Sequence, residues 1–152
     1  MLRDDINNSL KDAMKAGDAR RVSTLRLVNA SLKNADIEAR GQGKPALTDD
    51  DVLGVLQKMI KQRQESVELY EKGGRADLVA QEQGEIDVIS SYLPKQMTEA
   101  EIAETVALLV KETGASAMKD MGRVMAAIKE RYAGKLDTAK ASAAVKKLLT
   151  GG

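Results

Sequence analysis

The sequence predicts an all-α protein in two parts: an N-terminal antiparallel helical bundle or set of hairpins, and a small C-terminal domain of three helices. Apolar residues recur every three or four positions along most of the chain, the period of an amphipathic helix. Convincing strand alternation is lacking, and glycine and proline are concentrated at the joints between helical stretches. We expect the N-terminal domain to cover residues 1–93 and the C-terminal domain residues 94–152.

The first two predicted helices form a hairpin around Gly17, a residue that adopts the left-handed C-cap conformation at little cost. The first covers roughly residues 2–15, and its inner face carries Ile6, Leu10, Ala13 and Met14. Asp18 is a suitable N-cap for the second helix, which ends near Gly41. The second helix has a heptad-like stripe, the spacing with which antiparallel helices pack at shallow angles. This stripe consists of Leu25, Val28, Leu32, Ala35 and Ala39.

A long third helix is predicted after Thr48, which forms a capping-box pattern with Asp51. Gly73 and Gly74 end this helix, and a fourth helix runs up to Pro94. Each inner stripe contains one charged residue. The third helix carries Val52, Leu56, Met59, Arg63, Val67 and Tyr70. The fourth carries Leu78, Val79, Glu82, Ile86, Ile89 and Leu93.

The segment that starts at Pro94 predicts a domain boundary, because the residue before a proline is disfavoured in a helix. Thr98 and Glu101 then form a second capping-box pattern. The helix that follows ends at Gly114, and its inward residues are Ile102, Val106, Leu109 and Val110. Two further helices are expected over residues 121–132 and 138–149, which gives about seven helices in all.

The composition narrows the possible chemistry, because the 152 residues include no Cys and no His. Thiol nucleophiles, imidazole bases and the usual zinc and haem ligands are therefore missing, and we expect no cofactor and no metal. With three Tyr, no Phe and no Trp, base stacking on single-stranded nucleic acid is not expected as the main binding mode. No long apolar run or signal-peptide pattern occurs, so we expect a cytoplasmic protein that does not bind membranes.

Charge is unevenly placed along the chain. Residues 114–152 contain eight basic and three acidic residues, a net charge of +5. Residues 48–93 contain five basic and ten acidic residues, a net charge of −5. Such an asymmetry indicates what kind of partner each part attracts.

Five polar residues form a candidate cluster on the third and fourth helices and the turn between them. They are Arg63, Arg75, Asp77, Glu82 and Glu85. A guanidinium group can bind carboxylates bidentately, so the favoured interpretation is an internal ion-pair cluster that fixes the register of the hairpin. The alternative is a set of crowded carboxylates with perturbed protonation or a bound Mg²⁺.

The segment QRQESVELYEKGGRADLVAQEQGEIDVISSYLPKQMT, residues 62–98, resembles the signature of the YqeY family. In that family a Lys/Gln/Arg-rich helix and a Thr-capped helix flank a run of this form. The residues that carry the resemblance are Arg75, Asp77, Leu78, Glu82, Glu85, Tyr92, Leu93 and Pro94. The resemblance implies that the first part of the chain is like the helical N-terminal domain of that family.

The tail GASAMKDMGRVMAAIKERYAGKLDTAKASAAVKKLL is similar to the C-terminal tail domain of GatB, a subunit of the tRNA-dependent amidotransferase. The similar residues are Gly122, Val124, Met125, Gly134, Asp137, Val145, Lys146 and Leu149. In the amidotransferase this tail approaches the tRNA, so the resemblance implies an RNA contact through the basic residues. The candidates are Lys119, Arg123, Lys129, Arg131, Lys135, Lys140, Lys146 and Lys147.

We therefore predict a noncatalytic helper that associates with tRNA or another structured RNA, and we assign no catalytic residue. The large catalytic domain of GatB has no counterpart, since the chain lacks a Gly-rich phosphate loop and a Ser-Lys amidase pattern. One alternative is a partner-dependent carbon–nitrogen ligase component with glutamine as amido-nitrogen donor, to which Arg63, Glu82 and Glu85 would contribute. A second alternative is a helical adaptor that binds a protein partner in a groove between helices.

Overall fold

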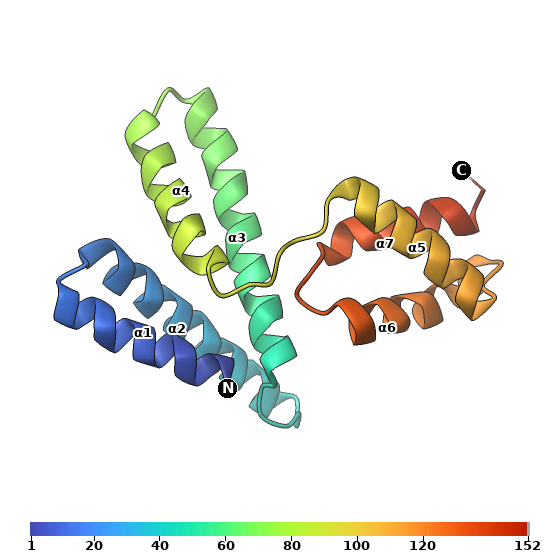
Figure 1. The fold of residues 1–152 in the computed structure, drawn as a ribbon, viewed down its shortest axis with the longest axis horizontal. Helices are drawn as coiled ribbons and strands as arrows, with labels where there is room; N and C mark the ends of the chain where they lie inside the picture. The colour runs from blue at the N-terminus through green and yellow to red at the C-terminus, as the bar shows by residue number, and fades with distance from the viewer. Residues whose placement is uncertain (152) are drawn as a thin grey trace. The chain divides into compact units, whose positions relative to one another are not determined.

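The computed structural model describes residues 1–151 of the chain. These residues form seven α-helices and one short 3₁₀ helix, without a strand (Figure 1), so the prediction of an all-α fold is confirmed. The contacts between helices divide the chain into two compact units, one covering Met1–Leu93 and the other beginning at Pro94. Each unit is described by itself.

The first unit consists of two helical hairpins, α1 with α2 and α3 with α4. Their bounds are α1 Leu2–Ala16, α2 Ala19–Gly41, α3 Asp49–Lys72 and α4 Ala76–Ser90. Gly17 ends α1 in the left-handed conformation, with φ of 70°, and the Asp18 side chain accepts a hydrogen bond from the Arg21 N–H at 3.1 Å. Thr48 and Asp51 form both hydrogen bonds of a capping box at the start of α3. The predicted caps are therefore the ones that set these helix ends.

Aliphatic side chains from all four helices form the core of the first unit. The buried residues are Ile6, Leu25, Val28, Leu32, Val52, Leu56, Met59 and Ile89. Thr24 is also buried, and its hydroxyl donates to the Arg20 carbonyl oxygen at 2.8 Å, so no polar atom is left unpaired there. The expectation that Met14 faces inward is wrong, because its side chain is 53% exposed at the last turn of α1.

The contact between α2 and α4 depends on a glycine. Gly84 lies in α4, and a Cβ atom at this position would stand 2.6 Å from Nη1 of Arg20, a side chain of α2. Arg20 therefore occupies the space that any other residue would fill with its own side chain. Just beyond the end of α4, the Tyr92 hydroxyl accepts a hydrogen bond from Arg21 of α2 at 2.9 Å. Sequence periodicity gives no sign of either contact.

The second unit is a three-helix domain. It consists of α5 Glu99–Thr113, the 3₁₀ helix η1 Met118–Asp120, α6 Met121–Tyr132 and α7 Thr138–Leu149. Thr98 and Glu101 form the predicted capping box, and Gly114 ends α5 with φ of 68°. The core is again aliphatic. Its buried residues are Ile102, Val106, Leu109, Val124, Ile128, Leu136, Ala141 and Val145.

The residues that precede α5 are fastened to the second unit by hydrogen bonds. The Met97 N–H donates to the Lys135 carbonyl oxygen at 2.7 Å. The Gln96 side-chain amide donates to the carbonyl oxygen of Gly134 at 2.6 Å. These two residues are therefore held to the loop between α6 and α7 and belong structurally to the second unit.

Replacing Gly84 with Ala tests the close contact of Arg20 with α4. Ala in place of Gly in a helix interior ordinarily stabilises by about 1 kcal/mol. We expect that gain for Gly54→Ala in α3, where no neighbouring atom lies within 4 Å of the new Cβ. Gly84→Ala should gain less, because Arg20 must move, and should recover the gain in an Arg20→Ala background. Equal free energies of unfolding for the two single variants would contradict the contact.

Candidate nucleic-acid interface

All eight predicted RNA-contact residues are exposed on the second unit. The reason lies in the helical period, because Val124 and Ile128 of α6 and Ala141 and Val145 of α7 point into the core. The basic residues of these two helices occupy other positions of the helical period, on the exposed side. Both helices therefore present their basic residues to solvent.

Three of the eight basic residues are paired with carboxylates. Arg131 binds the Glu112 carboxylate through both terminal nitrogens, at 2.8 and 3.0 Å. Arg123 contacts Asp120 at 3.2 Å, and Lys140 contacts Glu99 at 3.3 Å. Two of these partners, Glu112 and Glu99, lie in α5. They precede residue 114, so the net charge of +5 for residues 114–152 does not include them. From Pro94 onward the chain has ten basic and seven acidic residues, a net charge of +3.

The remaining five residues form what we call the lysine surface. It consists of Lys119, Lys129, Lys135, Lys146 and Lys147. Within residues 1–151, none of these ammonium groups forms an ion pair with a carboxylate. An exposed ammonium group without a carboxylate partner keeps its full charge available to a phosphate. The lysine surface is therefore the part of the predicted interface that is free to bind an anion.

Two carboxyl groups near this surface have lowered pKa values. The pKa of Glu112 lies below its ordinary value, chiefly because Arg131 donates hydrogen bonds to it and also because of the Arg131 charge. The pKa of Asp120 is lowered first by the hydrogen bond from the Ser116 N–H and less by the charge of Arg123. Asp120 is thus held mainly by the backbone, whereas Glu112 depends on its arginine.

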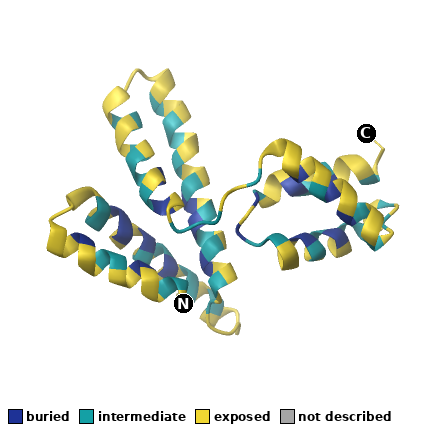
Figure 2. Cartoon of the chain, viewed as in Figure 1, coloured by how far each residue is buried: buried dark blue, intermediate teal, exposed yellow. Residues whose placement is uncertain are grey.

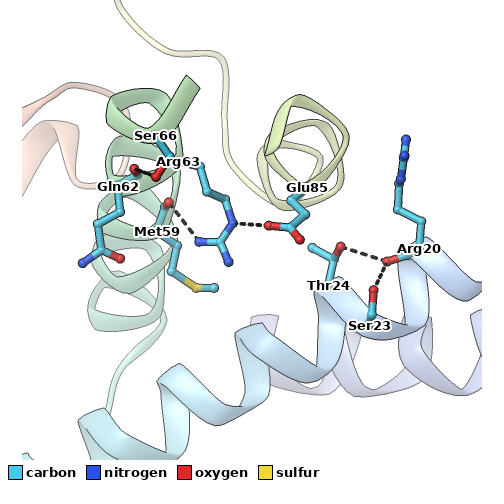
Figure 3. A network of polar contacts seen from close by, with 8 residues as sticks. All are labelled: Arg20, Ser23, Thr24, Met59, Gln62, Arg63, Ser66 and Glu85. Carbon is cyan, nitrogen blue, oxygen red and sulfur yellow. Dashed lines mark hydrogen bonds and ion pairs between the residues drawn. The ribbon is translucent and has the colours of Figure 1, made fainter. Parts of the chain in front are cut away.

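The predicted polar cluster separates into two pairs and one single residue. Arg63 of α3 donates from Nε to the Glu85 carboxylate of α4 at 2.8 Å and from Nη1 to the Met59 carbonyl oxygen at 3.1 Å (Figure 3). The two charged side chains are only 14% and 12% exposed. The Arg63–Glu85 pair therefore links the two helices in a nearly dry environment, where a lost partner is costly.

The other members of the cluster lie elsewhere. Arg75 pairs with Asp77 at 3.2 Å at the turn between α3 and α4, where both side chains are more than half exposed. Glu82 is partly buried and forms no ion pair within the described residues. Arg63 thus has one glutamate partner, and the cluster does not join all five residues. Among residues 1–151, no group of three or more His, Cys, Asp or Glu is arranged to hold a metal ion.

The dependence of Glu112 on Arg131 can be measured by NMR titration of the side-chain carboxyl groups. Arg131→Gln should raise the Glu112 pKa towards its ordinary value, whereas Arg123→Gln should leave it unchanged. Because the folded pKa is the lower one, the pair stabilises the fold above the unfolded pKa. That contribution is lost as the pH falls through the folded pKa. A Glu112 pKa that does not respond to Arg131→Gln would contradict the pairing.

The Arg63–Glu85 pair is testable by chemical unfolding. Arg63→Met leaves a nearly buried carboxylate without its partner, and we expect a loss of roughly 2 kcal/mol or more. Arg63→Met combined with Glu85→Met should recover most of this loss. The control is Arg75→Met, whose 58% exposed side chain should contribute less than about 0.5 kcal/mol. If the two single arginine variants unfold alike, the pair does not hold the hairpin.

No helix within residues 1–151 has both the length and the apolar character needed to cross a lipid bilayer.

Comparison with protein families matches residues 3–149 of this chain to the family described as Yqey-like protein. Fungal relatives named "Altered inheritance of mitochondria protein 41, mitochondrial" are also similar. The one from Pyrenophora tritici-repentis is 39% identical over 127 residues, which cover 80% of this chain and 68% of the relative. That from Lachancea thermotolerans is 36% identical over 110 residues, covering 71% and 57%. That from Saccharomyces cerevisiae is 30% identical over 97 residues, covering 64% and 51%.

The chain spans little more than half the length of the last two relatives. The family match, by contrast, includes both units and the whole segment from Gln62 to Thr98. The resemblance predicted from that segment is confirmed, and the chain belongs to the YqeY-like family.

Proposed function

We propose that the protein is a noncatalytic helper that binds tRNA or another structured RNA through the lysine surface. The observation that carries this proposal is the set of five exposed lysines on one small unit, each without a carboxylate partner among the described residues. Contacts to phosphates need positive charge and suitable spacing, and they do not need aromatic side chains. The resemblance of this unit to the amidotransferase tail that approaches tRNA supports the same choice of ligand.

The ion pairs of the second unit indicate which of the eight basic residues contribute most to RNA binding. Binding a phosphate through Arg131 or Lys140 first requires the loss of an ion pair to α5. The lysines of the lysine surface have no such competition, so they contribute most of the affinity. Lys146 and Lys147 are adjacent at the end of α7 and form its most concentrated charge. We propose the cytoplasm as the place of action.

Filter binding with bulk tRNA at two salt concentrations tests the proposal. We expect weak binding. The logarithm of the association constant should fall linearly with the logarithm of the salt concentration, with a slope of roughly −3 to −5, which is one unit or slightly less per lysine–phosphate contact. Lys146→Glu combined with Lys147→Glu should weaken binding by about tenfold or more at low salt, because two attractive charges become repulsive.

The matched control is Lys58→Glu combined with Lys61→Glu. These two exposed lysines of α3 form no ion pair within residues 1–151. The control variant should leave tRNA binding nearly unchanged. No affinity for tRNA at low salt, or an equal loss in both double variants, would rule out the proposal. The ligase alternative requires a different result: adding the protein to cell extract would have to increase glutamine-dependent amidation.

A further inference from the structure

The outer part of the α3–α4 hairpin, residues 64–83, has an incomplete core. We call this part the acidic arm. Closer to α2, the same two helices bury Val52, Leu56, Met59, Ile86 and Ile89. In the acidic arm no residue is buried, and Figure 2 shows only half-buried and exposed positions along both helices. The arm extends beyond the hairpin of α1 and α2 (Figure 1), so two helices pack there without a third.

Apolar side chains nevertheless continue along the acidic arm. Val67, Tyr70, Leu78 and Val79 carry on the inner stripes of the two helices, but all four are half-buried and lie outside the core of the first unit. Leu69 is 68% exposed on the flank of this seam. One hundred degrees separates successive residues of a helix, so Leu69 stands beside Tyr70 and widens the apolar strip.

The charge around this strip is negative. The acidic arm holds five acidic and two basic residues, a net charge of −3. Arg75 and Asp77 neutralise each other at the turn. Glu65, Glu68, Glu71 and Glu82 form no ion pair within the part of the chain described. A surface of this sign repels nucleic acid and attracts a basic partner.

We propose that the acidic arm is a docking surface for an amphipathic helix of a protein partner, with an apolar face flanked by Lys and Arg. Such a helix would supply the missing third helix: its apolar residues, spaced three and four apart, would cover the seam and Leu69. Its basic residues would pair with Glu65, which lies one turn before Leu69 on the same side of α3, and the net negative charge of the arm would attract them. The inference is independent of RNA binding, because it uses the other unit and the opposite charge.

A synthetic peptide of about 18 residues, roughly five helical turns, is a suitable probe. It carries Leu along one face and Lys on both flanks, and its binding to the full chain is followed by fluorescence anisotropy. Two further peptides serve as comparisons: one with the same residues scrambled so that no apolar face forms, and one with Glu in place of Lys. Both should bind about tenfold more weakly or worse. Equal binding of the scrambled peptide would overturn the proposal, because charge alone would then explain the affinity.

Variants of the chain localise the binding. Leu69→Asn, and separately Glu65→Lys, should each weaken peptide binding by about fivefold or more. The matched controls in α5 are Leu108→Asn, at a leucine that is 60% exposed, and Glu104→Lys. They should bind the peptide as the original chain does.

Equal losses in the α5 variants, or no loss in the arm variants, would overturn the proposal. So would self-association in light scattering that Leu69→Asn removes, because a second copy would then cover the strip. Binding of tRNA should be the same for Leu69→Asn, which changes no charge, and for the original chain, so this inference and the RNA proposal can fail separately.

Discussion

Burial in this protein requires three helices to meet. The core side chains are almost all aliphatic, since the chain has no Phe or Trp. Where α2 approaches α3 and α4, Val28, Leu56 and Ile89 are completely or almost completely removed from solvent. In the second unit α5, α6 and α7 achieve the same. Each closed core lies where at least three helices pack together. The acidic arm, where only two helices pack, has no closed core.

The sequence predicted the helices well because the signals for them are local. Thr48 with Asp51, Thr98 with Glu101, and the glycines at 17 and 114 set helix ends through contacts with near neighbours. The predicted helices over 121–132 and 138–149 have the bounds found in the structure. Periodicity, however, shows which face is apolar and not whether anything covers it. Val67 and Tyr70 have the same pattern as Val52 and Leu56, yet only the latter two are buried.

The candidate site was only partly predictable, because pairing joins residues that are distant along the chain. A charge count over a segment treats Arg131 and Lys146 alike, but Glu112 of α5 neutralises the first. Arg63 sits in an apolar stripe and was therefore expected to have an internal partner. Sequence alone did not distinguish Glu85 from Glu82, which stand three residues apart on one helix and face different surroundings.

The hydrogen bonds that hold Gln96 and Met97 to the loop between α6 and α7 determine where the chain can be divided. These two residues precede the first helix of the second unit, so a division placed at the start of α5 would leave two carbonyl oxygens of that loop without their donors. A division directly after Leu93 keeps the donors and acceptors in one fragment, and it leaves Tyr92 with its partner Arg21 in the other. The hydrogen bonds of Gln96 and Met97 therefore place the boundary for separating the two units between Leu93 and Pro94, several residues before α5 begins.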